Sequence, residues 1–263
     1  MKIAVSGATG RMGKLITEAI INSDDLKLVA AVTAPGVAEI GTDAGASLGK
    51  TTGVVITDDV QELAKADVLI DFTRPQATLA YLPFCVKHNV GVVIGTTGFD
   101  TQGKAQIAEA AKTVPVVFAP NMSVGVNSVL KLLEIAGAML SQYDCEIVEM
   151  HHKHKVDAPS GTALEMGRRV ALGRGVDFDS VALLSREGHT GERPDGAIGF
   201  AALRGGDVVG DHTVIFAGPG ERIEISHKSG SRAGYAQGAV TAARFLKDKS
   251  NGLFSMSDVL GFN

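Results

Sequence analysis

Over the first half of the chain, short apolar runs alternate with segments that have the periodicity of a helix. The predicted strands are residues 3–5, 28–32, 54–56, 68–70, 90–94 and 116–118. Between the first two strands, apolar residues from Met12 to Ile20 recur at the three- and four-residue spacing of a helix that buries one face. Strands that are apolar throughout are typical of a parallel sheet covered on both faces. The pattern predicts a doubly wound α/β domain with a Rossmann-type parallel sheet and right-handed crossovers.

The pattern changes after residue 122. A helix is predicted at about 124–140, and strands are predicted at 145–150, 181–184, 198–203, 208–216 and 222–227. The last of these strands alternates apolar and polar residues, which is typical of a mixed or antiparallel sheet with one solvated face. We therefore predict a first domain over 1–122 and a second α+β domain, built on a mixed sheet, over 123–231. A further helix is predicted at about 233–246, and we expect the region 232–263 to pack back on the first domain.

Composition and charge narrow the range of functions. Of 263 residues, 32 are glycine, about 12% against an ordinary usage of roughly 7%, which suggests tight turns and places where a ligand approaches the backbone. The formal net charge of −4 gives no support to nucleic-acid binding, and no apolar run approaches the roughly 20 residues of a membrane span. The two cysteines, Cys85 and Cys145, cannot form a disulfide framework. We expect a cytoplasmic protein with neither a nucleic-acid nor a membrane partner.

A glycine-rich turn follows the first predicted strand and opens the first predicted helix. It reads Gly7-Ala8-Thr9-Gly10-Arg11-Met12-Gly13, with the spacing G-x-x-G-x-x-G. In such a turn the first glycine permits the tight bend, the second lets the backbone approach a pyrophosphate, and the third allows close packing of helix and strand. The partial positive charge of the helix N-terminus then faces the phosphates. The segment predicts a site for a dinucleotide.

The end of the second predicted strand leaves the choice of dinucleotide open. An acidic residue about 20 positions after the glycines usually binds the ribose 2′-hydroxyl of NAD, but the chain reads Val32-Thr33-Ala34-Pro35 there. Thr33 can donate a hydrogen bond to either form of the ribose, and Arg11 or Lys14 can reach a 2′-phosphate. NADH and NADPH therefore both stay candidates.

Two further segments lie where predicted strands end. Gly95-Thr96-Thr97-Gly98 follows the fifth strand, and Ala119-Pro120-Asn121-Met122 follows the sixth. The C-terminal ends of parallel strands gather along one edge of the sheet, where ligands bind. Both segments are therefore expected at the nicotinamide end of the dinucleotide site.

The segment from Glu149 to Thr162 is unusually basic for this chain. It contains three of the seven histidines and two lysines within the five residues 151–155. Three interpretations compete: a zinc site, a solvated basic patch, and a catalytic site that binds an anion. Zinc is disfavoured because neither H-E-x-x-H nor a pair of closely spaced cysteines is present. Histidine exchanges a proton near neutral pH, and a nearby lysine can hold a carboxylate or protonate a product.

The end of the same segment, Pro159-Ser160-Gly161-Thr162, resembles the start of a helix. Ser or Thr would cap this helix, and Gly161 would expose backbone N–H groups to a carboxylate. Two anion sites within a few residues suggest a substrate that carries two carboxylates.

The chain resembles the dihydrodipicolinate reductase family, also called 4-hydroxy-tetrahydrodipicolinate reductases, of diaminopimelate and lysine biosynthesis. The resemblance covers essentially the whole chain and is strongest in EMHHKHKVDAPSGTA at 149–163. The other blocks are GATGRMG at 7–13, DFTRP at 71–75, IGTTGF at 94–99 and NMSVGVN at 121–127.

The resemblance implies roles for individual residues. It makes His151 the catalytic histidine and Lys155 the proton donor, with His152, Gly161 and Thr162 binding the substrate, and it implies no metal. For the dinucleotide it implies contacts with three segments, and the end of the second predicted strand adds Thr33. The resulting set is Gly7, Ala8, Thr9, Gly10, Arg11, Met12, Thr33, Gly95, Thr96, Thr97, Ala119, Pro120, Asn121 and Met122. The family often has an acidic residue at the position of Thr33 and an arginine at that of Ala34, and this chain departs from both.

The resemblance also implies a reaction and an assembly. NADH or NADPH would pass a hydride to C4 of a small cyclic dicarboxylate, with proton transfer by Lys155 and His151. Residues 1–122 would bind the dinucleotide, and residues 123–231 would bind substrate and form the contacts of a homotetramer.

Three other functions are compatible with a dinucleotide site. A short-chain dehydrogenase needs a lysine four residues after a tyrosine, but Cys85, Ile147 and Ala239 stand at that distance from the three tyrosines. A semialdehyde-type dehydrogenase needs a cysteine nucleophile, whereas both cysteines lie in apolar surroundings typical of small core residues. A non-catalytic dinucleotide sensor has no need of His151 and Lys155 beside a carboxylate-binding turn, and consumption of NADH or NADPH distinguishes it.

Overall fold

The computed structural model describes residues 1–262, and the chain divides into two compact units. Unit 1 comprises Met1–Val124 and the chain from Arg232 onward, and unit 2 comprises Gly125–Ser231. No helix within residues 1–262 combines the length and the apolar character needed to cross a membrane.

Unit 1 is built on a seven-stranded parallel sheet in the order β12-β6-β5-β4-β1-β2-β3. Its strands are β1 (Lys2–Ser6), β2 (Lys27–Val32), β3 (Ile56–Thr57), β4 (Val68–Asp71), β5 (Gly91–Ile94), β6 (Pro115–Phe118) and β12 (Gly252–Phe254). The strand order reverses between β1 and β4, and in open α/β sheets ligands bind beyond the C-terminal ends of the strands at such a point. The glycine-rich turn follows β1 and therefore lies at this position.

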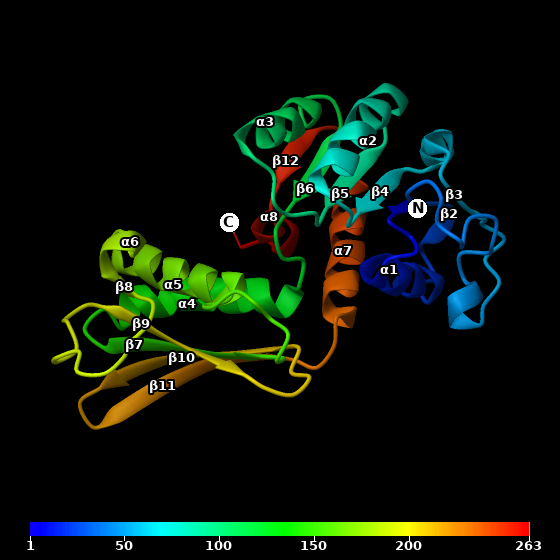
Figure 1. Cartoon of the computed structure of the whole chain (residues 1–263). Coiled ribbons are helices and arrows are strands. Elements are labelled where there is room, and N and C mark those ends of the chain that lie inside the picture. The colour runs from blue at the N-terminus through cyan, green and yellow to red at the C-terminus, as the bar shows by residue number, and fades with distance from the viewer. Residues whose placement is uncertain (263) are drawn as a thin grey trace. The chain divides into compact units, whose positions relative to one another are not determined.

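Helices cover both faces of the parallel sheet, which explains why its strands are apolar throughout. One face packs against α1 (Arg11–Ile21), α7 (Ala233–Leu246) and α8 (Met256–Leu260), and the other packs against α2 (Pro75–His88), α3 (Thr101–Ala110) and the 3₁₀ helix η2 (Val60–Lys65). Another short 3₁₀ helix, η1, spans Ala46–Leu48. Figure 1 shows α1 and α7 side by side on their face of the sheet.

Unit 2 is built on a five-stranded mixed sheet in the order β11-β10-β7-β9-β8. Its strands are β7 (Asp144–His151), β8 (Ala182–Leu183), β9 (Ile198–Arg204), β10 (Gly210–Gly218) and β11 (Glu221–Ser229). β10 pairs antiparallel with β7 and β11, whereas β9 pairs parallel with β7 and β8. Two helices, α4 (Val124–Met139) and α5 (Gly161–Arg174), cover one face and share a core with Ile147 and Phe216. The predicted fold class, a Rossmann-type sheet followed by an α+β part on a mixed sheet, is confirmed.

The structure differs from the predicted elements in places where the local signal was weak. The strand predicted at 181–184 is a helical turn, α6 (Phe178–Val181), followed by the two residues of β8. The side chain of Asp177 accepts a hydrogen bond from the N–H of Ser180 and starts this turn. β12 and α8 were not predicted, because each is too short to carry a period of its own.

Candidate active site

The glycine-rich turn has the backbone geometry that its spacing predicts. Gly7 has a φ of 63°, and the N–H of Gly10 donates to the carbonyl of Gly7 over 2.9 Å. A Cβ at Gly13 would lie 2.1 Å from the Gly7 carbonyl oxygen, so only glycine lets α1 pack this closely on the turn. α1 starts at the N-cap Gly10 without a side-chain cap, so its first N–H groups can donate to an anion such as a pyrophosphate.

The end of β2 brings a second hydroxyl beside a hydroxyl of the turn. Thr33 follows β2, is 4% exposed, and lies 2.9 Å from Thr9 between hydroxyl oxygens. The structure therefore joins the turn to the end of the neighbouring strand. Ala34 is exposed and adds no charge, and Arg11 is exposed at the start of α1. Within residues 1–262, the side chain of Thr33 is hydrogen-bonded to neither a carboxylate nor a cationic group. Its surroundings therefore do not distinguish NADH from NADPH.

The two other predicted segments end strands of the same sheet. Ala119 donates its N–H to the carbonyl of Ile94 over 3.2 Å, which joins the end of β6 to the end of β5. A Cβ at Gly95 would lie 2.2 Å from the ring of Phe72, so a glycine is needed for this contact. Helix α7 packs even more closely, because a Cβ at Gly238 would lie 1.7 Å from the carbonyl oxygen of Met122. The structure thus gathers the turn, Thr33, residues 95–97 and residues 119–122 along the C-terminal edge of the parallel sheet.

A buried carboxylate at this edge was not found from the sequence. Asp71 ends β4, is fully buried, and accepts hydrogen bonds from four side-chain hydroxyls. Its Oδ1 accepts from Ser6 over 2.5 Å and from Thr73 over 2.7 Å, and its Oδ2 accepts from Thr78 and, over 3.0 Å, from Thr96. The hydroxyl of Thr96 also accepts from the N–H of Thr73 over 2.8 Å. Asp71 therefore joins β1, the turn before α2 and the segment after β5.

In unit 2, the end of β7 places His151 beside a buried carboxylate. Glu149 and His151 share one face of the strand because side chains alternate with a period of two. Glu149 is 1% exposed and His151 is 9% exposed. The Oε2 atom of Glu149 lies 2.6 Å from Nδ1 of His151, and the guanidinium of Arg204, from β9, donates to both carboxylate oxygens over 2.8 and 2.9 Å. Burial opposes ionisation of Glu149, but the hydrogen bonds from Arg204 and His151 outweigh it and hold the pKa of this carboxyl below its usual value.

The start of α5 is tied to the same carboxylate. Ser160 is the N-cap of α5, as predicted, and its hydroxyl accepts from the N–H of Ala163 over 3.2 Å. The N–H of Ser160 donates to Oε1 of Glu149 over 3.1 Å. The Ser160 hydroxyl also lies 2.9 Å from Nε2 of His212, a residue of β10 that is 3% exposed. Burial and the neighbouring His151 lower the pKa of His212 to about 4, so His212 is neutral at pH 7.

The remaining predicted substrate and proton-transfer residues lie on the segment between β7 and α5 and at the start of α5. The ammonium of Lys155 donates to the carboxylate of Asp157 over 2.8 Å, and this hydrogen bond holds the pKa of Asp157 below its usual value. Among the residues that the structure describes, Lys155 makes no hydrogen bond to His151. His152 is half-buried, and its Nδ1 atom is buried without a hydrogen-bond partner in this part of the chain. Gly161 and Thr162 form the first positions of α5, where free N–H groups favour an anion.

The cysteines do not have the properties of a nucleophile. Both thiols are free and buried, and burial raises the pKa of each to about 12. A thiol in such surroundings is not ionised near neutral pH and does not act as a nucleophile.

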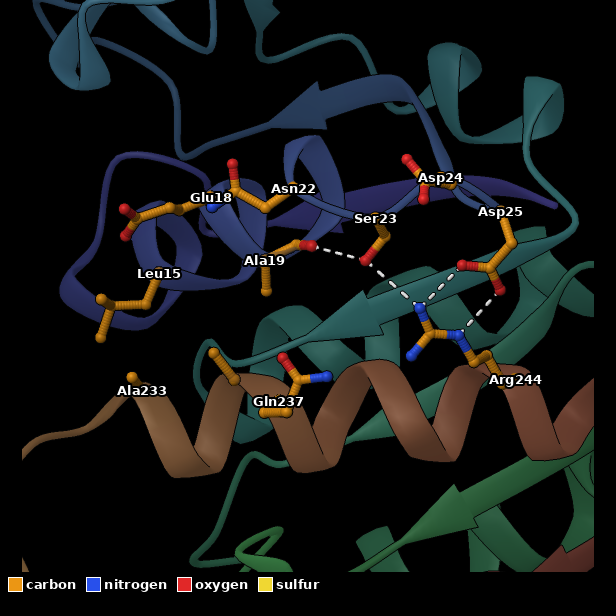
Figure 2. Close-up of a pocket in the computed structure, with 11 residues that line it drawn as sticks. Leu15, Glu18, Ala19, Asn22, Ser23, Asp24, Asp25, Ala233, Gln237 and Arg244 are labelled. Carbon is orange, nitrogen blue, oxygen red and sulfur yellow. Dashed lines mark hydrogen bonds and ion pairs between the residues drawn. The ribbon is translucent and has the colours of Figure 1, made fainter.

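A separate cavity of about 590 Å³ lies between α1 and α7 in unit 1 (Figure 2). Asp25 and Arg244 form an ion pair at one end of it, with 2.8 Å between Oδ1 and Nη2, and hydrogen bonds from Arg244 lower the pKa of Asp25 to about 2. None of the predicted dinucleotide residues lines this cavity. The ion pair anchors α7 to the segment before β2.

The whole chain matches the two parts of one protein family. Residues 1–122 match the family model for "Dihydrodipicolinate reductase, N-terminus", and residues 125–260 match the model for "Dihydrodipicolinate reductase, C-terminus". Curated proteins named 4-hydroxy-tetrahydrodipicolinate reductase are similar over their full length. Those of Cupriavidus metallidurans and Polynucleobacter necessarius subsp. necessarius are each 59% identical to this chain over 263 residues, which is 99% of either sequence.

Solved structures share the fold. A dipicolinate-bound dihydrodipicolinate reductase from Paenisporosarcina sp. TG-14 has a TM-score of 0.77 at 24% identity, and the match covers 97% of each chain. A probable dehydrogenase from Thermotoga maritima has a TM-score of 0.61 at 14% identity, covering 98% of this chain and 92% of that one. From the two family models and the full-length identity together, the chain belongs to the dihydrodipicolinate reductase family.

Proposed function

We propose that the protein reduces 4-hydroxy-tetrahydrodipicolinate to tetrahydrodipicolinate with NADH or NADPH, in the diaminopimelate route to lysine. The observation that carries this proposal is the identity of 59% to curated reductases over essentially the whole of both chains. In the net reaction the substrate loses water and gains a hydride at C4 and a proton, while the dinucleotide is oxidised.

The dinucleotide is assigned to unit 1. The glycine-rich turn fits a pyrophosphate because Gly10 is exposed with no side chain over its backbone and the N-terminus of α1 has no side-chain cap. The proposed contacts are residues 7–12, Thr33, residues 95–97 and residues 119–122. A reduced nicotinamide dinucleotide supplies the hydride when it is bound there.

Unit 2 is assigned to substrate binding and proton transfer. The ionised carboxylate of Glu149 accepts a hydrogen bond from Nδ1 of His151, so Nε2 is the atom of this ring that exchanges a proton with the substrate. Lys155 supplies the proton that completes the product, and it exchanges its contact with Asp157 for one with the bound dicarboxylate. The first turn of α5, with Gly161 and Thr162, holds one substrate carboxylate, and His152 contacts the substrate.

The test is consumption of NADH and of NADPH by the purified protein with freshly made substrate, followed by the absorbance of the reduced nicotinamide. We expect turnover with at least one dinucleotide. We also expect His151→Ala and Lys155→Ala each to lower kcat by about 10²-fold or more, the contribution of a general acid–base group, while the dinucleotide still binds. Wild-type turnover in both variants would contradict the assignment.

We also propose that the protein is a cytoplasmic homotetramer whose subunits meet through the mixed sheet. The face of this sheet away from α4 and α5 carries apolar side chains, among them Leu203, which is 50% exposed, and its register partner Met150. A solvated face of this kind would be covered by a second copy. Light scattering on wild-type protein and on Leu203→Glu tests this, with a tetrameric mass expected for the first and a smaller mass for the second.

A further inference from the structure

Glu149 carries more contacts than the proton-transfer chemistry of His151 requires. Both of its carboxylate oxygens are occupied: Oε2 by His151 and Arg204, and Oε1 by the N–H of Ser160 and Arg204. A carboxylate that is 1% exposed has lost its hydration, and this loss is offset only where donors fill its acceptor positions. The four donors meet that requirement, and they come from β7, β9 and the start of α5.

We propose that Glu149 is a positioning residue, which aligns His151 through one carboxylate oxygen and the first turn of α5 through the other. This inference rests on the proposed function, because it assigns to His151 the proton transfer and to α5 the substrate carboxylate. Arg204 strengthens the alignment, since it also donates to the carbonyl of Asp157 over 2.7 Å and so ties down the segment between β7 and α5.

The contact decides which nitrogen of His151 is reactive. An ionised carboxylate can only accept, so the neutral imidazole carries its proton on Nδ1 and keeps a lone pair on Nε2. An amide at position 149 would present an N–H to Nδ1 in one of its two orientations and would favour the opposite tautomer.

The other groups around His151 do not replace Glu149. Arg204 on β9 is a cation, and Lys155 comes from the segment after β7. His212 on β10 meets the ring of His151 edge-on, with 5.1 Å between centroids, and is neutral at pH 7. His227 on β11 lies beyond His212, and burial lowers its pKa as well. Glu149 is therefore the anion that contacts the imidazole directly.

The experiment compares wild type with Glu149→Gln, Glu149→Asp and the control Glu146→Gln. Glu146 is a matched control because it lies on the same strand, faces the opposite side, and is likewise paired with arginines, Arg186 and Arg193. We expect Glu149→Gln to lower kcat by about 10²-fold and to move the proton of the neutral His151 ring from Nδ1 to Nε2, which nitrogen NMR of histidine-labelled protein detects. Its Kd for NADPH stays at the wild-type value. Glu149→Asp keeps a carboxylate that can only accept and so keeps the His151 proton on Nδ1, and Glu146→Gln matches wild type in both respects.

A kcat of Glu149→Gln within about twofold of wild type, with the His151 proton still on Nδ1, overturns the proposal. Should Glu149→Gln fail to fold, nitrogen NMR of histidine-labelled wild type decides, with the His151 signals assigned from His151→Ala. A neutral His151 with its proton on Nδ1 supports the alignment, and a proton on Nε2 overturns it. The NMR measurement needs no turnover. If the wild-type protein oxidises neither NADH nor NADPH, the proposed function is refuted, and the NMR result still decides whether Glu149 aligns His151.

Discussion

Replacing Asp71 with asparagine should destabilise unit 1 strongly, although the two side chains have the same shape. In the wild type, two hydroxyls donate to each oxygen of a carboxylate that is fully buried. An amide keeps one oxygen and presents an N–H₂ group in place of the other, so two of the four hydroxyls lose their acceptor in either orientation. Hydrogen bonds to a charged group contribute about 1.5 to 3 kcal/mol each.

The expected loss is therefore about 3 kcal/mol in the free energy of unfolding, or a fall in Tm of about 6 to 12 °C. Rearrangement limits the loss, because the Thr78 hydroxyl has an alternative acceptor in the carbonyl of Arg74 at 3.3 Å. The Thr96 hydroxyl already accepts from the N–H of Thr73 and so cannot simply reverse its role. Urea denaturation of wild type and Asp71→Asn measures the difference. Asp67→Asn is the control, since this exposed carboxylate accepts only from the N–H of Lys2 in the described hydrogen bonds.

A double-mutant cycle with Thr78→Val shows whether the loss arises in the cluster. Because Thr78 donates to Asp71, the two substitutions should be coupled by about 1 to 2 kcal/mol. The reasoning is refuted if Asp71→Asn is within about 0.5 kcal/mol of wild type, or if the two effects add without coupling.

Three further outcomes are expected. Gly238→Ala should lower Tm and weaken NADPH binding, because its Cβ would lie 1.7 Å from the Met122 carbonyl oxygen. Gly234→Ala on the same helix should be neutral or slightly stabilising, because the nearest atom to its Cβ would be 4.0 Å away. Equal effects of the two substitutions in calorimetry would contradict this. The pKa of His212 is lowered from 6.5 to about 4 in the folded state. Between pH 4 and pH 6.5, His212 is therefore protonated in the unfolded chain and neutral in the native state. Protonation of His212 should therefore lower the free energy of unfolding by about 3 kcal/mol between about pH 7 and pH 4. In urea unfolding, the stability of His212→Gln should depend correspondingly less on pH. A pH dependence equal to that of wild type would contradict the argument. Thr33→Asp should raise the ratio of kcat/KM for NADH to that for NADPH at least about tenfold, because a carboxylate binds the ribose hydroxyls of NADH and repels the 2′-phosphate of NADPH. Side-by-side titrations of both dinucleotides measure this ratio. An unchanged ratio would show that Thr33 does not face the ribose.

The features predicted correctly from the sequence depend on neighbours in the chain. The strand, turn and helix around Gly7 to Gly13 have a local period and a local spacing, and Ser160 caps the helix that begins one residue later. The fold class follows in the same way, from runs that are apolar throughout before residue 122 and from alternating ones after it.

The features that were missed depend on contacts between distant segments. The donors to Asp71 come from Ser6, Thr73, Thr78 and Thr96, and no window of sequence shows that they meet. Arg204 is 55 residues from Glu149, and His212 is 52 residues from Ser160. Glu149 lies inside the segment that the sequence singles out, but its role depends on β9 and β10 pairing with the two edges of β7 and on α5 beginning beside Glu149.

The most direct test of the central claim follows the hydride and the proton separately. NADH or NADPH with deuterium in both positions at C4 of the nicotinamide should transfer one deuterium to C4 of the product. The same reaction in deuterated water with unlabelled dinucleotide should place solvent deuterium elsewhere on the ring. Mass spectrometry and NMR of the product read both positions. Deuterium from the dinucleotide at C4 is the result that the account predicts, and a product without it would contradict the assignment of this chain as a hydride-transferring reductase.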